Sequence, residues 1–327
     1  MTAMSRFPPM NQIIVGHAAS VMAGWPSRSI DNIICSPPYW TAVTYSIEHS
    51  WRLYEDYLAD MQRVWVECAR VLRPNGKLCI NAMIMPVPQP KPNRTQEPRR
   101  LLDIPVDIQN GILAKTDLRL FEKFTWQKQT SPNMFGAGLR PGNNIANNTT
   151  ESITIYVKPG KPRKFASSVI AANRMSGVIK RDLIQQVWFM YPEDVKRRGG
   201  HPAPFPEILP ARLIKLFTFG AVDDFPGEIV LDPFCGGGTT CAVAKMMGHR
   251  WIGIDINEHY VEMARERVEK AVVGNVPLLL VGTPPWPSTE GLEATKLGFI
   301  GRAAGEAKHK RRTYGRKVPM PAGAGKS

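Results

Sequence analysis

Apolar and polar residues follow two different rhythms along the chain, which predict strands and helices in turn. Short apolar runs predict strands, and stretches with an apolar residue at every third or fourth position predict helices. The predicted strands are residues 12–16, 29–35, 77–83, 118–127, 152–157, 227–231 and 251–254. The predicted helices are residues 55–72, 104–114, 207–219, 239–247 and 260–272. Strands and helices in this succession are typical of an open α/β sheet.

A glycine-rich turn follows the predicted strand at 227–231. Its sequence is Asp232-Pro233-Phe234-Cys235-Gly236-Gly237-Gly238-Thr239-Thr240, and a predicted helix begins at its end. In open α/β sheets, such a strand–turn–helix unit binds a nucleotide-like ligand at the carboxyl end of the strand. Glycine lets the backbone approach the ligand closely, because a Cβ would clash there. A turn with a purely structural role is the alternative.

The next predicted strand ends in Asp255. This carboxylate comes 23 residues after Asp232, close to the spacing of an acid that binds ribose hydroxyls. The glycine turn alone is a weak signal, and an exposed Asp without a ligand is the alternative. Turn, helix, strand and terminal acid together predict a cofactor site.

A second candidate site follows the predicted strand at 29–35. Its sequence is Ser36-Pro37-Pro38-Tyr39, with Trp40 next to it. Two successive prolines form a stiff, extended segment that donates no backbone hydrogen bond. Carbonyl and hydroxyl acceptors beside an aromatic ring suit a planar ring that carries an amine. Taken alone, an exposed Pro-Pro turn would be the better explanation.

Together, the two motifs resemble those of the site-specific DNA methyltransferases that methylate N4 of cytosine or N6 of adenine. In the β arrangement of that family the catalytic motif precedes the cofactor motif. Ser36, Pro37, Pro38 and Tyr39 match the catalytic motif, and Asp232, Pro233, Phe234, Gly236, Gly238, Thr239 and Thr240 match the cofactor loop. The resemblance covers most of residues 11–270. The motif order argues against a dehydrogenase, whose dinucleotide turn normally opens the domain.

The resemblance implies an α/β fold with a single Rossmann-like methyltransferase domain, circularly permuted, a small basic insertion and a flexible basic tail. It divides the chain into residues 11–157 (catalytic half), 158–200 (target recognition), 201–275 (cofactor-binding half) and 276–327 (basic, disordered tail). S-adenosyl-L-methionine is the implied cofactor, and no metal is required because its sulfonium is already a strong electrophile.

The implied roles of the catalytic residues follow from the chemistry of an amine. Ser36 Oγ and the Pro37 carbonyl would accept its two protons and localise its lone pair toward the methyl group. Tyr39 would stack on the extruded base. Enzymes of this family that methylate the amine of cytosine usually carry Ser-Pro-Pro-Tyr, and this resemblance favours cytosine over adenine. Adenine therefore stays open as the alternative.

Other residues receive cofactor roles from the same resemblance. Asp232 would bind the methionine end of the cofactor and Asp255 its ribose. His201 resembles part of the cofactor motif, and a buried core histidine is an equally good interpretation. The family usually has an acid after the glycine that ends its strand beside the adenine, where this chain has His17 after Gly16.

Charge supports a polyanionic partner. The chain of 327 residues has a net charge of +14, with 42 Lys and Arg against 28 Asp and Glu. Ten Lys and Arg but three acids lie between Lys158 and Arg198, and a further basic group spans residues 308–317. Neutralised phosphates release counterions, so double-stranded DNA is the expected partner. A basic protein that binds nucleic acid on a methylase scaffold without turnover is the alternative from another class.

The sequence says less about the cellular compartment and the assembly of the protein than about its motifs. The five cysteines form neither a metal-ligand nor a disulfide pattern, which indicates free thiols in a reducing cytoplasm. No apolar run is long enough to span a membrane, and no signal-peptide pattern is seen at residue 1. The family resemblance also leaves room for a cognate restriction endonuclease and for a homodimer.

Overall fold

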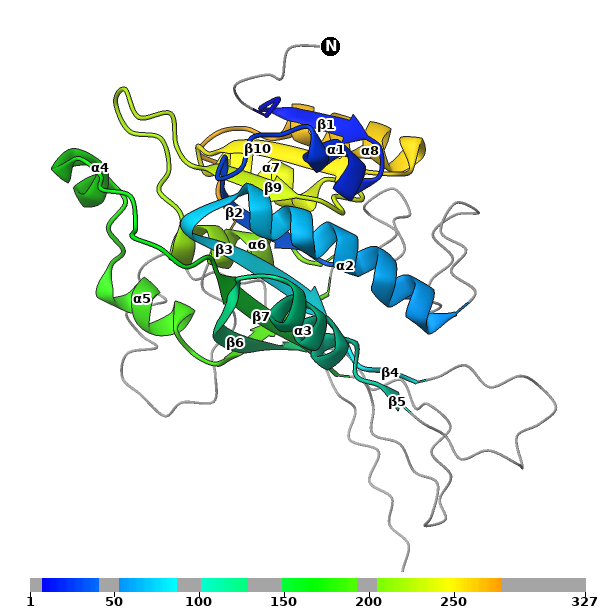
Figure 1. Ribbon diagram of the computed structural model, residues 1–327. Helices are drawn as coiled ribbons and strands as arrows, with labels where there is room; N and C mark the ends of the chain where they lie inside the picture. Colours follow the sequence, from blue (N-terminus) through cyan, green and yellow to red (C-terminus); the bar gives the residue numbers. More distant parts are fainter. Residues whose placement is uncertain (1–7, 41–52, 87–100, 129–148, 193–204, 278–327) are drawn as a thin grey trace, which may run out of the picture. The chain divides into compact units, whose positions relative to one another are not determined.

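The computed structural model describes residues 8–40, 53–86, 101–128, 149–192 and 205–277. Within them, eight strands form one sheet in the spatial order β1-β10-β9-β2-β3-β7-β6-β8 (Figure 1). The strands are β1 (Gln12–Val15), β10 (Arg250–Asp255), β9 (Ile229–Asp232), β2 (Ile30–Cys35), β3 (Leu72–Ala82), β7 (Thr150–Val157), β6 (Arg119–Lys128) and β8 (Val187–Met190). A separate ribbon pairs β4 (Met85–Pro86) with β5 (Leu101–Leu102).

Strand direction brings distant parts of the chain to one edge of the sheet. β1, β10, β9, β2 and β3 are parallel, and β7 runs antiparallel to β3. β6 runs antiparallel to β7 and parallel to β8. All strands except β7 therefore end at the same edge, which we call the carboxyl edge, and β7 begins there. The opposite edge is the amino edge.

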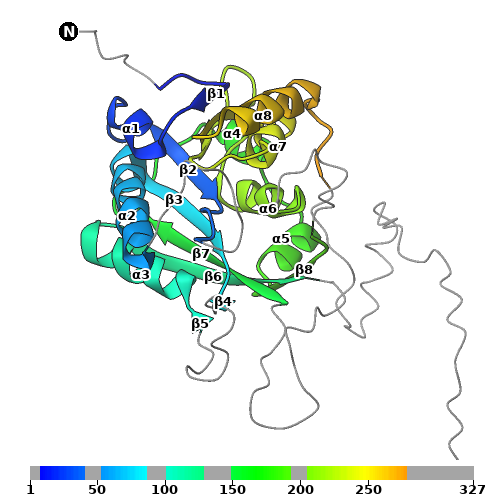
Figure 2. The same ribbon diagram turned by 90° about the vertical axis from the view of Figure 1, so that its right-hand side faces the viewer.

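Helices cover both faces of the sheet, as Figure 2 shows. One face packs against α1 (Ala18–Ala23), α2 (Tyr54–Val71) and α3 (Ile104–Lys115), and the other against α6 (Ile208–Phe217), α7 (Thr239–Met246) and α8 (Glu258–Lys270). Side chains of a strand point alternately to its two faces, so neighbours such as Ile33 and Ile34 belong to different cores. Burial on both faces explains why the strands are apolar runs rather than alternating patterns.

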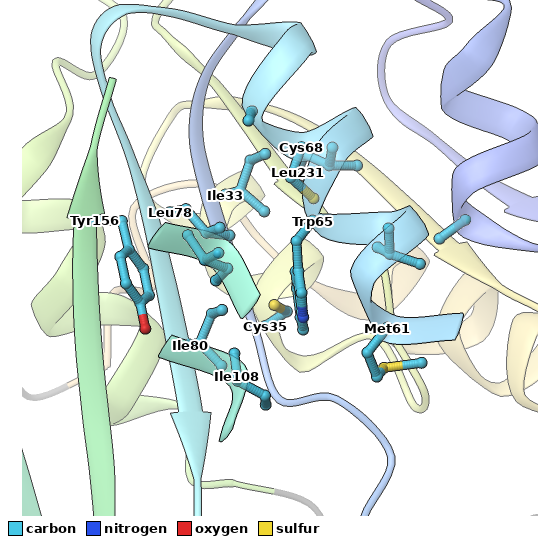
Figure 3. Packing of buried hydrophobic residues seen from close by; sticks show 14 of the residues in the cluster. Ile33, Cys35, Met61, Trp65, Cys68, Leu78, Ile80, Ile108, Tyr156 and Leu231 are labelled. Carbon is cyan, nitrogen blue, oxygen red and sulfur yellow. The ribbon is translucent and has the colours of Figure 1, made fainter. Parts of the chain in front are cut away.

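The predicted helix at 55–72 is confirmed as α2, and its apolar stripe forms the centre of one core. Met61, Trp65 and Cys68 face the sheet residues Ile33 and Leu78 in Figure 3. Trp65 is fully buried there. The stripe therefore fixes α2 over β2 and β3, next to the strand end that carries Ser36.

The other predicted helices and strands are confirmed with small shifts in their bounds, but β3 begins earlier than its sequence predicts. It follows α2 directly at Leu72 and contains Pro74 and Gly76. Asn75 has a φ of +65°, and the pairing of β2 with β3 shifts register between Ile30 and Asn32. The turn residues thus end the helix, as expected, but they form an irregular first part of the strand.

Residues 158–192 contain regular elements that the sequence does not predict. They form α4 (Ser167–Ala172), α5 (Gly177–Leu183) and strand β8 at the end of the sheet. Trp188 of β8 is 1% exposed and stacks on Phe124 of β6, with ring centroids 4.5 Å apart. The described part of the predicted target-recognition segment therefore contributes a strand to the main sheet, and the bounds of the four predicted segments stay predictions.

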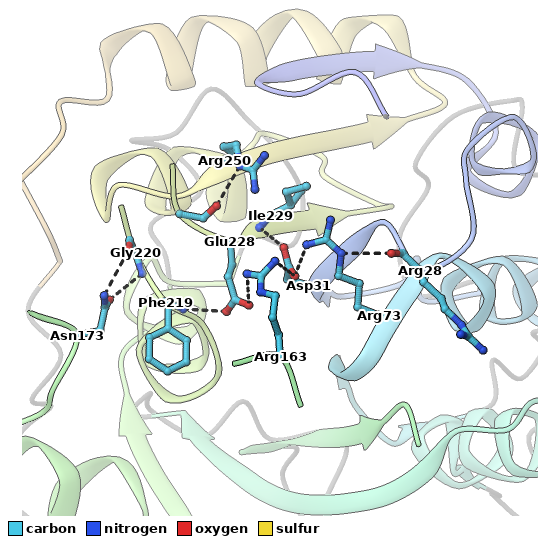
Figure 4. Close-up of polar contacts among 11 residues, drawn as sticks. Arg28, Asp31, Arg73, Arg163, Asn173, Phe219, Gly220, Glu228, Ile229 and Arg250 are labelled. Carbon is cyan, nitrogen blue, oxygen red and sulfur yellow. Dashed lines mark hydrogen bonds and ion pairs between the residues drawn. The ribbon is translucent and has the colours of Figure 1, made fainter. Parts of the chain in front are cut away.

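Basic residues of that segment take part in ion pairs at the amino edge (Figure 4). Arg163 contacts Glu228 at 3.0 Å and Asp31 at 3.6 Å, and Arg73 contacts the same Asp31 oxygen at 2.7 Å. Asp31 Oδ2 also accepts the backbone N–H of Ile229. These contacts bind the start of the segment to the first residues of β2, β3 and β9, away from the carboxyl edge.

Further expectations from the sequence concern the cysteines, metal ligands, membrane spans and the tail. All five cysteines are free and buried. Among the described residues, no group of three or more His, Cys, Asp or Glu could hold a metal ion. None of the described helices has the length and apolar character needed to cross a membrane. Most of the predicted tail, residues 278–327, lies outside the described residues.

Candidate active site

The two predicted motifs meet at the carboxyl edge. Ser36 follows the last residue of β2, and Asp232 is the last residue of β9. These strands are neighbours, with Ile33 paired to Leu231, although the two motifs are nearly 200 residues apart in the chain. Asp255 ends β10 on the other side of β9. Parallel strands of an open sheet bind their ligands at this edge.

Asp255 organises the glycine-rich turn through its two carboxylate oxygens. Oδ2 accepts the backbone N–H of Gly236 at 2.8 Å, and Oδ1 accepts that of Asn257 at 2.9 Å. The backbone N–H of Cys235 donates to the Ile254 carbonyl in addition. The predicted ribose acid therefore also has a structural role, because it ties the turn after β9 to the end of β10.

Two different constraints explain why glycine is required in the turn. Gly236 and Gly238 have φ values of +46° and +79°, a region that favours glycine. A Cβ on Gly238 would come within 2.8 Å of Ala264 in α8. At Gly238 the structure therefore shows a close approach to α8, and the expected close approach of this glycine to a ligand stays a prediction.

The remaining residues of the predicted cofactor loop are mostly buried. Pro233, Thr239 and Thr240 are buried and Phe234 is partly buried, with its ring 5.7 Å from that of Trp65. Thr239 Oγ1 accepts a hydrogen bond from Arg267 of α8 at 2.8 Å. α7 begins at Thr239 without a capping side chain in the described part of the chain.

Asp232 lies beneath the turn and is 1% exposed. Its Oδ1 accepts the backbone N–H of Phe234 at 3.0 Å. Burial raises the pKa of this carboxyl to about 7, and the neighbouring Asp255 carboxylate adds to the rise. Since the folded state then holds this proton more tightly than the unfolded state does, the carboxyl stabilises the fold at acid pH. That contribution is lost as the pH rises toward 7.

We expect cofactor affinity to depend on pH through Asp232. A proton on Asp232 competes with the cationic methionine end of the cofactor, so binding should weaken about tenfold between pH 8 and pH 6. Calorimetric titrations with S-adenosyl-L-methionine at both pH values measure this. Asp232→Asn is the control, because it cannot ionise and should bind weakly at both. Equal affinity of the wild type at pH 6 and 8 would contradict this role.

The catalytic tetrapeptide is held by hydrogen bonds of its own. Ser36 Oγ lies 2.9 Å from the hydroxyl of Tyr39, and that hydroxyl donates to Glu151 Oε2 at 3.1 Å. Pro37 and Pro38 are buried, and Tyr39 is 4% exposed. The tetrapeptide is therefore not an exposed turn, and Ser36 is its most accessible residue before Trp40.

Lys128, Asn81 and Glu151 are not among the predicted site residues. The structure nevertheless links all three to the tetrapeptide, because Glu151 contacts both others and accepts the hydrogen bond of Tyr39. Lys128 Nζ lies 2.6 Å from Glu151 Oε1, and Asn81 Nδ2 donates to Glu151 Oε2. Their positions at the ends of β6 and β3 and the start of β7 are the signal that could identify them. All three positions lie at the carboxyl edge.

Two other sequence expectations have different outcomes. His17, which stands where relatives usually have an acid, lies 3.0 Å from Asp60 of α2. Burial alone would raise the pKa of Asp60, but hydrogen bonds from His17 and Arg63 lower this pKa to about 2. An acid is thus brought to this strand end by another element. His201 lies outside the described residues, so its role stays a prediction.

Comparison with known proteins bears on the family of the chain. A family model described as DNA methylase, of the N6/N4 type, matches residues 30–266. Type II methyltransferase M.HpaI of Haemophilus parainfluenzae is 27% identical over 277 residues, 80% of this chain and 76% of that protein. DNA adenine methyltransferase YhdJ of Escherichia coli (strain K12) is 28% identical over 272 residues, 79% of this chain and 83% of that protein.

Solved structures agree with the fold. TTHA0409 of Thermus thermophilus, complexed with S-adenosyl-L-methionine, has a TM-score of 0.65 and 28% identity. The match covers 84% of this chain and 99% of that one. The cytosine-N4-specific PvuII DNA methyltransferase has a TM-score of 0.58 at 16% identity, over 83% and 89%, and shows a common fold. The chain therefore belongs to the N6/N4 family of DNA methylases, enzymes that use S-adenosyl-L-methionine as the methyl donor.

Proposed function

We propose that this chain methylates the exocyclic amine N4 of cytosine at specific sites in double-stranded DNA. The observation that carries the proposal is the position of Ser36, which follows β2 at the carboxyl edge directly beside the β9 turn. A hydroxyl in that place is an acceptor for an amine proton.

The residues at the β9 turn fit the cofactor. Among the described residues no side chain caps the start of α7, so backbone N–H groups of its first turn suit a carboxylate. Asp255 stands where an acid binds ribose hydroxyls in related folds. The cofactor supplies, when bound, a methyl group that is already electrophilic.

The chain's own residues prepare the amine. Its lone pair is conjugated with the ring of the base, which makes it a poor nucleophile. Acceptance of its two protons by Ser36 Oγ and the Pro37 carbonyl localises this lone pair and orients it. The ring of Tyr39 is largely covered in the structure. Stacking therefore requires that the target base reach the small part of this ring that is exposed.

Adenine N6 is the second candidate target, and a specific observation favours it. YhdJ, with 28% identity over most of both chains, is named as a DNA adenine methyltransferase. The choice between the two bases depends on Ser36, because adenine-methylating relatives more often have an acid or amide at that position of the motif.

Nucleoside mass analysis tests the proposal. Purified protein is incubated with unmodified double-stranded DNA and S-adenosyl-L-methionine, and the digested DNA is examined for methylated cytidine and adenosine. N4-methylated cytosine is the expected product. N6-methylated adenine would replace the first candidate by the second. Cofactor binding without methyl transfer to any DNA would instead favour a nucleic-acid-binding protein without turnover.

A homodimer, a cognate restriction endonuclease and a cytoplasmic location are further proposals. A homodimer is tested by light scattering of the purified protein, and a cognate restriction endonuclease by cleavage of unmethylated but not methylated DNA in the source cells. Cell fractionation tests the cytoplasmic location.

DNA binding is expected to weaken steeply with salt, and Arg197 and Arg198 are the residues to neutralise. Lys158 and Arg163 of the same basic segment are bound to Asp117 and to Glu228, whereas Arg197 and Arg198 lie outside the described residues. Their double neutralisation should flatten the slope of log affinity against log salt concentration by about two. Fluorescence anisotropy with a DNA duplex measures the slope. Neutralising exposed Lys161 and Lys164 is the matched control, and an equal effect of both pairs would refute a specific contact.

A further inference from the structure

Three strands contribute polar side chains to a cluster that accepts the hydrogen bond of the Tyr39 hydroxyl. Asn81 comes from β3, Lys128 from β6 and Glu151 from β7. Glu151 occupies the centre, because its Oε2 accepts hydrogen bonds from Tyr39 and Asn81 and its Oε1 contacts Lys128. The Tyr39 hydroxyl thus has Glu151 as one hydrogen-bond partner and Ser36 Oγ as another.

The carboxylate determines the direction of the hydrogen bonds. An ionised carboxylate only accepts, so the Tyr39 hydroxyl must donate its single proton to Glu151. The ammonium of Lys128 compensates the charge of Glu151 at 2.6 Å. The same constraint sets Asn81, whose Nδ2 and not its carbonyl must face the carboxylate.

The direction passes on to Ser36. Because the proton of Tyr39 is used for Glu151, the 2.9 Å contact between the two hydroxyls is possible only if Ser36 donates to Tyr39. The single proton of Ser36 then points toward the hydroxyl of the buried Tyr39. Ser36 Oγ therefore presents lone pairs alone to a substrate, which is the polarity that an amine proton needs.

We propose that Glu151 is a positioning residue which, through Tyr39, fixes Ser36 Oγ as a hydrogen-bond acceptor for the target amine. The proposal rests on the proposed function, since it concerns the acceptor role of Ser36. Without this constraint, the Ser36 hydroxyl could also turn its proton toward the amine nitrogen. It would then bind the lone pair that must attack the methyl group, and methyl transfer would be slower.

Glu151→Gln tests the polarity with little change in shape. Lys128 only donates, so it holds the amide oxygen of the new side chain at the position of Oε1. The amide nitrogen then faces Tyr39 and donates to it, and the Asn81 amide turns over so that its Oδ1 accepts the second N–H. Tyr39 would donate to Ser36, and Ser36 would turn its proton toward the substrate. The substitution therefore reverses the chain of hydrogen bonds instead of only weakening it.

Single-turnover methylation rates and dissociation constants for DNA and cofactor are measured for four proteins: wild type, Glu151→Gln, Tyr39→Phe and the double variant. Glu151→Gln should lower the rate about 10- to 100-fold with both affinities near wild type, the scale for partners that orient a catalytic group. Tyr39→Phe, which frees Ser36 without reversing it, should lose less. In the Tyr39→Phe background, Glu151→Gln should have little further effect, because the reversal needs the tyrosine hydroxyl.

The pattern separates positioning from mere structural support. If Glu151→Gln lowers the rate equally with and without the Tyr39 hydroxyl, or not at all, the proposal is wrong. Glu122→Gln, an exposed residue of β6, is the control for loss of one negative charge. Thermal melting checks the fold, and should Glu151→Gln unfold, a wild-type rate for Tyr39→Phe still overturns the proposal. A wild type that binds cofactor but methylates no DNA overturns the proposed function itself.

Discussion

Ser36→Ala is expected to lower the single-turnover rate of methyl transfer by about 10²–10³, by analogy with the removal of one positioned polar group elsewhere. Affinities for DNA and cofactor should stay near those of the wild type. In the proposed acceptor role, the hydrogen bond from the amine to Ser36 should strengthen as the amine nitrogen becomes tetrahedral, so it would act mainly in the transition state. The partly exposed Ser36 lies at the tetrapeptide's surface, and its loss leaves no cavity in either core.

Rapid-quench measurement of one turnover with saturating DNA and cofactor gives the rate directly. Ser168→Ala, which removes an exposed hydroxyl at α4, is the matched control and should have no effect. A wild-type rate for Ser36→Ala would assign the acceptor role to another group. The preference for cytosine would then lose its main support, since it depends on the serine of the motif.

Local sequence patterns predicted the parts of the site that depend on single strand ends. Ser36 and Asp255 each follow an apolar run, and an apolar run buried on both faces is a strand whose end is easy to locate. Their shared edge then follows from parallel strand direction alone. The positions of both candidate motifs were predictable for that reason.

Contacts that need the register of several strands were not predictable in this way. Glu151 meets Tyr39 only because β7 runs antiparallel to β3 and begins at the carboxyl edge. A shift of one residue would turn Glu151 to the other face of the sheet. Gly238 is a second case, because its close neighbour Ala264 belongs to α8, which follows later in the chain. The distance between Gly238 and Ala264 cannot be predicted from the sequence around either residue.

The segment 158–192 was the main part of the described fold that composition obscured. Its many basic residues suggest a solvated loop, yet β8 is in the sheet and Leu183 of α5 is fully buried. Arg212 of α6 provides the link between these elements, and it is itself 1% exposed. A buried arginine is not predictable from charge pattern, because arginine is almost always at the surface unless it is paired.

Asp182→Ala is therefore expected to destabilise the whole fold by about 3 kcal/mol, the lower end of the range for breaking a buried ion pair, because Arg212 is buried but the Asp182 side chain is 24% exposed. Arg212 donates to the Asp182 carboxylate at 2.6 Å and to its backbone carbonyl at 2.9 Å. Its guanidinium also lies 4.6 Å from the ring centre of Trp188. Burial lowers the pKa of Arg212 and Asp182 opposes that shift, so removal of the carboxylate takes away an interaction that offsets the cost of burying this charge.

Urea unfolding measures the loss, and its m-value decides what unfolds. If α5 and β8 are integral to the sheet, the midpoint falls while the m-value stays constant, because the same surface is exposed in one transition. Asp117→Ala removes the exposed partner of Lys158 and is the control, with an expected cost below about 1 kcal/mol. A similar small cost for Asp182→Ala, or a separate early transition, would mean that this segment is a peripheral unit.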